Sequence, residues 1–536
     1  MRHRRIGRRT FVRNAFSVGA SLAAPWSKLG TRRPTGFGAQ PPAVVRSDSA
    51  LPRITHGVAA GDVHDGRAVV WSRADRPSRL LIEYATSDSF RDVRRVRGPA
   101  ALGPSDFTAR VVLTDLPPGQ RIFYRATFQD LEDLRAFSQP GLGSFVTPEA
   151  AATSGRNVTI AFSADTVGQG WGINPDWGGL RLYETMRRAQ PDVFINLGDT
   201  IYADQPLERE VKLDDGTMWR NVVTEAKSKP AQSIDEFRGA FQYNLQDESM
   251  RRFNAEVAQI VLWDDHEVRD NWYPTRDLRS DERYTEKSVA MLAARGQQAF
   301  REYNPLPIDS DDPERIYRTV RLGPLVEVFA LDLRSYRGPN SPNRQAMLDE
   351  GSALMGRAQL DWLKARLAAS RATWKIIASD LPIGLVVPDG ATDFEAFANA
   401  DPGAPLGREL EIAELLRYIK ARRVRNTVWI TADVHYCAAH HYEPTAARFT
   451  EFEPFWEFVA GPLHAGTFGP NALDPTFGPT VKFTGIPPGM KPNRPPSQGL
   501  QFYGLLRVNA RTQALTASLH DLTGKSLYSV ELAAAS

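Results

Sequence analysis

The length and composition of this chain define its broad class before any motif is considered. It has 536 residues, of which 42% are hydrophobic and 24% are charged. These are the proportions of a globular protein, and the length exceeds that of one ordinary domain. No apolar run reaches the roughly 18 residues that a membrane-spanning helix requires, so we expect no transmembrane segment in the mature chain.

The formal net charge of +3 is determined by the N-terminus. The first 40 residues contain no acidic residue and nine basic ones, namely Arg2, Arg4, Arg5, Arg8, Arg9, Arg13, Lys28, Arg32 and Arg33. Removing these nine charges from +3 leaves a mature chain at −6. Such a chain has no basic surface for nucleic acid, so nucleic-acid binding is not expected.

The same N-terminal segment has the features of an export signal. Arg8 and Arg9 are followed by Phe11 and by a modest apolar stretch at 15–24. This arrangement resembles a twin-arginine signal peptide, and the alternative is a basic, disordered N-terminus. We expect residues 1–40 to be a signal peptide and linker that the twin-arginine export machinery recognises. The mature protein would then be periplasmic or secreted.

The predicted elements change character near residue 150. Between 51 and 148, short runs such as RAVVWSR and IFYRATF are separated by turns, and no helical periodicity intervenes. This pattern predicts an N-terminal antiparallel β-sandwich similar in outline to a fibronectin type III domain. From 155 to 536, apolar strands alternate with amphipathic helices, which predicts a second domain of the α/β class.

Polar residues cluster where three apolar strands of the α/β region end. Asp199 follows DVFINL, the block Asp264–Glu267 follows AQIVLW, and Asp433 and His435 follow NTVWI. Strand ends of this kind are the usual ligand position in an open α/β sheet. Buried carboxylates in such numbers repel one another unless a cation lies between them. The simplest explanation is a multivalent metal centre, which predicts a metallohydrolase.

Several of these residues have a chemical reason to act at such a site. Asp433 and His435 are alternate residues at a strand end, so they point the same way if the strand continues, which suits two adjacent metal ions or one shared ion. His266 can donate a proton to a leaving group near neutral pH, unless it is a surface histidine paired with Glu267. Asp199 stands at a sharp turn, and its alternative role is to cap a helix or to form that turn.

Five motifs in this order resemble the alkaline phosphatase D (PhoD-like) family, a branch of the calcineurin-like metallophosphoesterases. They are HGVAAGD with VVWSR, GDTIYAD, WDDHEV, LDLRSYR and ADVHY. The resemblance extends over nearly the whole chain after the leader. It implies that residues 155–536 form an α/β/β/α metallophosphoesterase domain. It also implies hydrolysis of phosphoesters by a metal-activated water.

The resemblance assigns roles to individual residues. It implies a multinuclear metal centre held by Asp165, Asp199, Tyr202, Asp265, Asp433 and His435. By this resemblance, Asp199 would bridge two ions, and His266 would contact the phosphate and the leaving group as the catalytic residue. The best-known family pattern has a cysteine ligand where this chain has Asp165, and the chain resembles a subgroup with GQGWG at 168–172. The implied metals are Fe³⁺, which could hold Tyr202 as phenolate, together with Ca²⁺; Mn²⁺ and Zn²⁺ are the alternatives.

Substrate binding is predicted for two arginines of LDLRSYR. Arg334 and Arg337 are candidates to clamp phosphate oxygens bidentately, and surface salt bridges are the alternative. Asp380 ends the strand WKIIASD, where related enzymes place a metal histidine, so the resemblance makes Asp380 a further candidate metal ligand.

The sequence therefore predicts an exported, metal-dependent phosphodiesterase or phosphomonoesterase. Two alternatives remain open. One is a phospholipase D-type hydrolase of the same family. The other is a non-catalytic protein that uses its sandwich domain to bind a cell-envelope polymer.

Overall fold

The computed structural model describes residues 51–150 and 155–535. The predicted signal peptide at 1–40 lies outside the described residues, so it stays a prediction. Within the described part, no helix is both long and apolar enough to cross a membrane.

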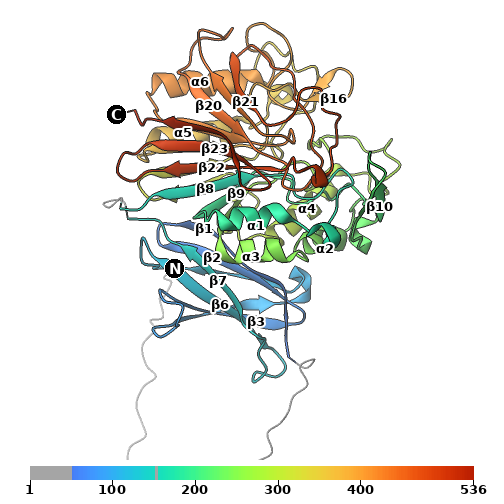
Figure 1. Cartoon of the computed structure of the whole chain (residues 1–536), viewed down its shortest axis with the longest axis vertical. Helices are drawn as coiled ribbons and strands as arrows, with labels where there is room; N and C mark the ends of the chain where they lie inside the picture. The colour runs from blue at the N-terminus through green and yellow to red at the C-terminus, as the bar shows by residue number, and fades with distance from the viewer. Residues whose placement is uncertain (1–50, 151–154, 536) are drawn as a thin grey trace, which may run out of the picture. The chain divides into compact units, whose positions relative to one another are not determined.

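The N-terminal part of the described chain is a β-sandwich (Figure 1). One layer consists of β1 (Ile54–His64), β2 (Arg67–Ala74) and β5 (Thr108–Leu113). The other layer has the order β4-β3-β6-β7, with β3 (Ser78–Ala85), β4 (Arg94–Ala101), β6 (Arg121–Asp130) and β7 (Gly141–Val146). Alternate residues of β3 and β6 are buried, the period expected where one face of a strand lies on a core. The predicted sandwich is confirmed.

The chain forms two larger sheets, and the first of them includes the sandwich layer β1, β2 and β5. The first has nine strands in the order β24-β23-β22-β8-β9-β12-β1-β2-β5. Its further strands are β8 (Val158–Ser163), β9 (Val193–Asn196), β12 (Ala258–Val261), β22 (Phe502–Val508), β23 (Leu515–Asp521) and β24 (Ser526–Leu532). The second has seven strands in the order β13-β14-β15-β18-β20-β19-β21. They are β13 (Arg318–Leu322), β14 (Val326–Ala330), β15 (Trp374–Ala378), β18 (Thr427–Thr431), β19 (Ala438–Tyr442), β20 (Phe455–Val459) and β21 (Pro479–Thr484).

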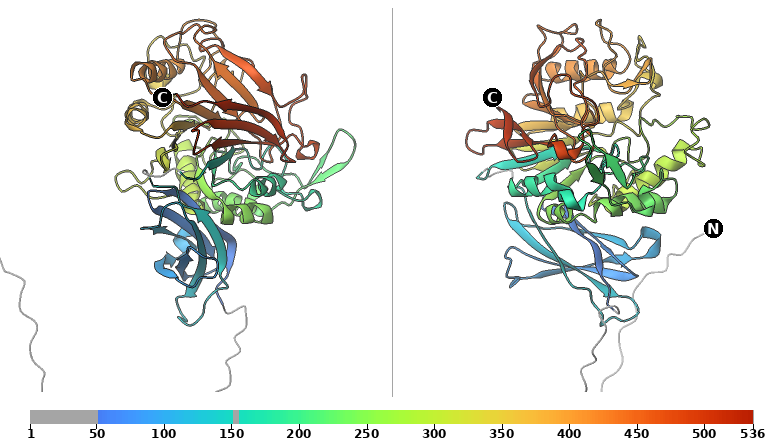
Figure 2. Two further views of the ribbon diagram at one scale, coloured as in Figure 1. Left: turned by 60° about the vertical axis from the view of Figure 1, so that its left-hand side comes forward. Right: turned by 45° about the vertical axis from the view of Figure 1, so that its right-hand side comes forward.

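Helices cover the outer faces of these sheets (Figures 1 and 2). On the first sheet lie α1 (Arg181–Arg188), α2 (Ile234–Asn244), α3 (Glu248–Glu256) and α4 (Val289–Tyr303). On the second lie α5 (Arg357–Ala369) and α6 (Glu409–Ala421). Two short hairpins, β10–β11 (Glu210–Lys212 and Met218–Arg220) and β16–β17 (Pro388–Asp389 and Asp393–Phe394), complete the strands.

The inner faces of the two sheets share one apolar core. Ile160 and Ile195 of the first sheet belong to the same buried cluster as Val328, Ile376 and Ile430 of the second. The central strands β8, β9 and β12 run parallel, as do β14, β15, β18 and β20, so their carboxyl ends meet at one edge of each sheet. The layers are therefore helix, sheet, sheet, helix, which confirms the predicted α/β/β/α architecture.

The sandwich is joined to the α/β part through a shared sheet. Gly61 of β1 pairs in parallel with Gln259 of β12, so the nine-stranded sheet runs through both parts. A Cβ atom on Gly61 would lie 2.6 Å from the carbonyl oxygen of Pro305, so the close approach requires glycine. The buried carboxylate of Asp62 also forms a bidentate ion pair with Arg318 of β13, 2.5 and 2.8 Å long. The division between 148 and 155 predicted from the sequence thus cuts a continuous sheet.

We predict that Asp62→Asn destabilises the protein by about 2–3 kcal/mol, because it leaves the Arg318 guanidinium without its buried counter-charge. Asparagine retains the shape and suits the backbone φ of 44° at this position. The measurement is chemical unfolding of purified protein. Asp92→Asn, at an exposed position of the sandwich, is the control and should change stability by less than about 0.5 kcal/mol. Equal stability of the two variants would contradict the prediction.

Candidate metal centre

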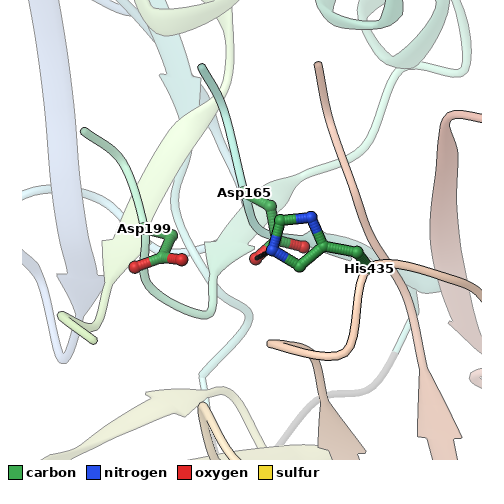
Figure 3. A group of neighbouring side chains, drawn as sticks. All are labelled: Asp165, Asp199 and His435. Atoms are coloured by element: carbon green, nitrogen blue, oxygen red, sulfur yellow. Dashed lines mark ion pairs between the residues drawn. The ribbon is translucent and has the colours of Figure 1, made fainter. Parts of the chain in front are cut away.

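The polar residues predicted from the sequence meet at the carboxyl ends of the two sheets. Asp165 follows β8, Asp199 follows β9 and His435 follows β18, and Figure 3 shows their side chains together. These three residues and Asp433 have φ values of 63°, 50°, 60° and 66° in that order. Left-handed residues turn the chain sharply, so the side chains stand at the strand ends instead of continuing the alternation of a strand. Strand β18 (Thr427–Thr431) does not continue to Asp433 and His435, so the condition under which they would point the same way is not met, although both lie at this edge.

Three overlapping groups of side chains could each hold a metal ion. In each group one donor atom per residue lies within 4.8 Å of the others. The groups are Asp165 with Asp199 and His435, Asp199 with Asp265 and His266, and Asp264 with Asp265 and Asp433. Asp199 and Asp265 each occur in two of them, which is the arrangement needed for a bridging carboxylate.

Unpartnered oxygen atoms support this assignment. Both carboxylate oxygens of Asp165 and the Oδ1 atom of Asp265 are buried without a hydrogen-bond donor among the described residues. Leaving such atoms unpaired is costly in a protein interior. Carboxylate and imidazole donors suit hard or borderline cations such as Ca²⁺, Mn²⁺, Fe³⁺ and Zn²⁺. The residues present therefore fit a multinuclear metal centre.

His435 presents one ring nitrogen to this centre. Its Nδ1 lies 2.7 Å from the carbonyl oxygen of Gly466, which fixes the proton on Nδ1. Burial lowers the pKa of His435 to about 4, so the ring is neutral and its Nε2 is free to accept. Nε2 lies 2.9 Å from the hydroxyl of Tyr202. The ring thus has the tautomer of a metal ligand.

Tyr202 is buried against both histidines of the site. Its ring stacks on that of His266 with the centroids 4.1 Å apart. Burial, followed by the charges of Asp199 and Asp165, raises the pKa of Tyr202 well above its usual range. A phenolate here therefore needs a nearby multivalent cation.

His266 is oriented by a carboxylate that the sequence-based prediction missed. Its Nδ1 lies 2.7 Å from Oδ1 of Asp204, and the side chain of Asp204 is buried. Burial opposes the charged imidazolium, but the carboxylates of Asp204, Asp265 and Asp199 raise the pKa of His266 well above its usual value. His266 is therefore a buried imidazole that is held by Asp204 through Nδ1 and whose Nε2 points away from Asp204.

Glu267 is not the partner of His266. Its carboxylate accepts hydrogen bonds from the backbone N–H groups of Asp199, Thr200, Ile201 and Asp264, at 2.6–3.3 Å. Burial raises the pKa of Glu267 to about 7. Glu267 thus ties the loops after β9 and β12 together, and the alternative of a surface histidine paired with Glu267 is wrong.

Arg334 and Arg337, the predicted phosphate clamps, lie in the interior behind the centre. Nε of Arg334 donates to Oδ1 of Asp264 at 2.5 Å, and Nη1 forms a short ion pair with Glu395. Nη2 of Arg337 donates to Asn340 and to the carbonyl of Glu395. Burial lowers the pKa of Arg337 to about 10. The contacts of both guanidinium groups are with the protein itself, and their role in binding substrate stays a prediction.

The electrostatics of the site favour a bound cation. Burial, and then the charges of neighbouring carboxylates, raise the pKa values of Asp165 and Asp433 well above their usual range. Burial likewise raises that of Asp199, with Asp265 and Asp264 adding to the effect. Raised values mean that the ionised forms are disfavoured in the interior, first because burial removes water from them and then because neighbouring carboxylates repel them. A multivalent cation reverses this effect by stabilising the ionised forms.

The structure brings every predicted metal ligand and His266 to one place. The contributions of Asp204 and Glu395 were missed. Asp204 could have been found from the sequence, because it lies within the motif GDTIYAD. Glu395 lies in the β16–β17 region and belongs to no motif, so nothing in the sequence indicated it.

The fold and the carboxylate-rich centre define the protein as a phosphoester hydrolase with a metallophosphoesterase fold. Family models of known proteins match the chain in two segments. The model of the PhoD-like phosphatases matches residues 161–519, and that of the PhoD-like phosphatase N-terminal domain matches residues 39–148. The chain belongs to the PhoD-like phosphatase family.

Individual relatives agree with this assignment. Alkaline phosphatase D of Bacillus subtilis (strain 168) is 26% identical over 449 residues, which are 80% of this chain and 71% of that protein. The solved structure of PhoD matches with a TM-score of 0.66 at 21% identity and covers 89% of this chain and 92% of that one. A purple acid phosphatase from yellow lupin (Lupinus luteus) seeds matches with a TM-score of 0.53 at 11% identity, covering 90% and 74%. The two solved structures confirm the predicted fold class.

We predict that Gly168→Ala inactivates the enzyme without unfolding it. The added Cβ atom would lie 2.4 Å from the ring of Tyr202, and this buried ring has to move to relieve the overlap. Displacement of about 1 Å at a reacting centre can cost about 100-fold in rate. The measurement is turnover of a phosphoester alongside thermal unfolding. Gly155→Ala, where an added Cβ atom meets nothing within 4 Å, is the control and should retain full activity. An active Gly168→Ala enzyme would show that the position of Tyr202 does not matter.

Proposed function

We propose that this protein is an exported, metal-dependent phosphoester hydrolase that acts on phosphodiesters or phosphomonoesters. The observation that carries the proposal is the set of three overlapping donor groups with bare, buried carboxylate oxygens at the sheet edges. Membership of the PhoD-like phosphatases supports the reaction class, and the Arg8-Arg9 motif supports export by the twin-arginine route to the periplasm or the medium.

In this proposal the metal centre is held by Asp165, Asp199, Tyr202, Asp265, Asp433 and His435. Its donor set of carboxylates, one phenol and one imidazole suits Fe³⁺ with Ca²⁺, and Mn²⁺ or Zn²⁺ are alternatives. When bound, the metal ions would supply a water made nucleophilic at neutral pH and positive charge near the phosphate.

The chain's own residues supply orientation and a proton. Asp204 holds Nδ1 of His266, which leaves Nε2 to face the reacting groups, near Asp265 and Asp270 at 4.0 and 3.8 Å. The protonated ring would give its Nε2 proton to the departing alkoxide. The stacked ring of Tyr202 keeps the imidazole plane fixed.

We predict that Asp199→Asn loses both bound metal and turnover, because a neutral amide cannot bridge two cations as a carboxylate does. Substitution of a residue that only hydrogen-bonds a metal ligand typically lowers metal affinity or activity about 10–100-fold. Loss of a bridging ligand itself should therefore cost more. Elemental analysis and assays of bis-p-nitrophenyl phosphate and p-nitrophenyl phosphate measure the two effects and rank diester against monoester. Asp176→Asn, at an exposed position, should behave as wild type. Full activity of Asp199→Asn would reject the proposed centre.

We also predict a change of pH dependence in Asp204→Asn. The Asp204 carboxylate helps to raise the pKa of His266, so its removal lowers that pKa. Because the protonated imidazole is the donor, the alkaline limb of kcat/KM should move to lower pH. A substrate with an alkyl leaving group should show the shift, whereas a p-nitrophenyl ester, which needs little protonation, should show less. An unchanged alkaline limb with the alkyl ester would exclude His266 as the acid.

A further inference from the structure

Two buried carboxylates lie outside the metal centre and are joined by one asparagine. They belong to Glu409, the first residue of α6, and to Asp474 in the loop before β21, and each of these residues is 1% exposed. The backbone N–H of Asn399 donates to Oδ2 of Asp474 at 3.3 Å, and its Nδ2 donates to Oε2 of Glu409 at 3.0 Å. The asparagine therefore holds the two carboxylates close together in the interior.

Two oxygen atoms of this group have no partner. Oε1 of Glu409 and Oγ1 of Thr476 are buried without a hydrogen-bond partner among the described residues. Thr476 is tied to the pair by its backbone N–H, which donates to Oδ1 of Asp474 at 2.8 Å. Its hydroxyl lies near enough to the Glu409 carboxylate to lower the pKa of that group. Unpaired oxygen atoms are costly in a protein interior, so two of them in one place indicate a bound group.

The positive charges of the chain nearest to this pair have other partners. Arg408 precedes Glu409 in the sequence, but its guanidinium donates to the backbone carbonyl oxygens of Phe394 and Glu395. Arg344 is paired with the partly exposed Asp401. Among the described residues, no arginine, lysine or histidine forms an ion pair with either carboxylate of the pair. Both carboxylates can therefore be ionised together only with a cation from outside the chain.

A buried pair of carboxylates can be neutralised by a proton or by a metal ion. Burial, and then the charge of Asp474, raise the pKa of Glu409 to about 9, so without a cation the Glu409 carboxyl would carry a proton at neutral pH. A proton leaves the bare oxygen atoms of Glu409 and Thr476 without a hydrogen bond of suitable geometry. A cation uses both oxygen atoms at once and removes the repulsion between the carboxylates. The bare oxygen atoms thus favour the cation.

We propose that Glu409, Asp474 and Thr476 form a structural calcium site that is separate from the metal centre. Two carboxylates and a hydroxyl offer hard oxygen donors, which Ca²⁺ takes in a flexible geometry. The donor set contains no nitrogen or sulfur, so a transition metal is a poorer fit. The ion ties the loop before α6 to the loop before β21. Because the site shares no residue with the three groups of the centre, the proposal does not depend on the proposed function.

The test measures the calcium content and the thermal unfolding of Glu409→Gln. Glutamine has the shape of a protonated glutamate but carries no charge to hold a cation. Both measurements are made in the Asp199→Asn background, where the ions of the proposed centre are expected to be absent. One calcium ion per chain should remain with Glu409 and none with the glutamine. Calcium at about 100 times its dissociation constant should raise Tm by about 3 °C over EGTA with Glu409 only.

Two further variants separate calcium binding from a loss of packing. Glu411→Gln is the matched control, because Glu411 is equally buried on the same turn of α6 but accepts hydrogen bonds from three backbone N–H groups. It should lower stability without changing the calcium content. Thr476→Val removes only the hydroxyl and should weaken calcium binding. It carries the test should Glu409→Gln fail to fold.

Two results would overturn the proposal. Equal calcium content and an equal response of Tm to calcium with and without Glu409→Gln would show that Glu409 is a protonated acid, a role that glutamine fills. An equal loss of calcium in Glu411→Gln would show that these variants only loosen the fold. Metal ions retained by Asp199→Asn would instead reject the proposed centre. The difference of one calcium ion made by Glu409→Gln would still be counted, so the two failures are distinguishable.

Discussion

Mutual repulsion among buried carboxylates is the constraint on which the active-site region depends. Each carboxylate is accommodated in one of three ways. Glu267 accepts four backbone N–H groups, Asp204 and Asp264 are paired with His266 and Arg334, and Asp165 keeps two bare oxygens. The first two arrangements complete the structure without help from outside the chain. The third does not, and this difference separates residues that hold the loops from residues that are available for metal ions.

The charged residues of this region are divided between the two sheets. The first sheet supplies Asp165 and Asp199 and the block after β12, whereas the second supplies Asp433, His435 and Arg334. The shared apolar core behind these loops fixes the distance between the two sheets. Electrostatic repulsion at the edge is therefore opposed by the hydrophobic contacts of the whole interface rather than by local contacts alone.

The motifs indicated which residues gather at this edge, because most of them come within a few residues of the end of a strand whose apolar sequence is easily recognised. A carboxylate that follows such a strand has few positions available to it. Its position in the sequence therefore indicates its position in the fold. Glu395 has no such strand before it, and its role depends on a buried ion pair with a residue 61 positions away. Long-range pairs of this kind leave no periodic trace in a sequence. The same limit applies to the shared nine-stranded sheet, since the pairing of β1 with β12 joins residues nearly 200 positions apart.

The buried arginines show why a residue type at a strand end does not by itself define a role. Arg334 was predicted to bind phosphate because a planar guanidinium suits phosphate oxygens, but the same geometry suits carboxylates. The role of such an arginine is decided by which anions lie within reach of its guanidinium. Those anions are positioned by the loops of both sheets. Here the anions within reach are carboxylates of the protein itself, namely those of Asp264, Asp265, Asp380, Glu395 and Asp433. The role of a strand-end arginine therefore depends on the anions that the rest of the fold places around it, which a motif alone does not specify.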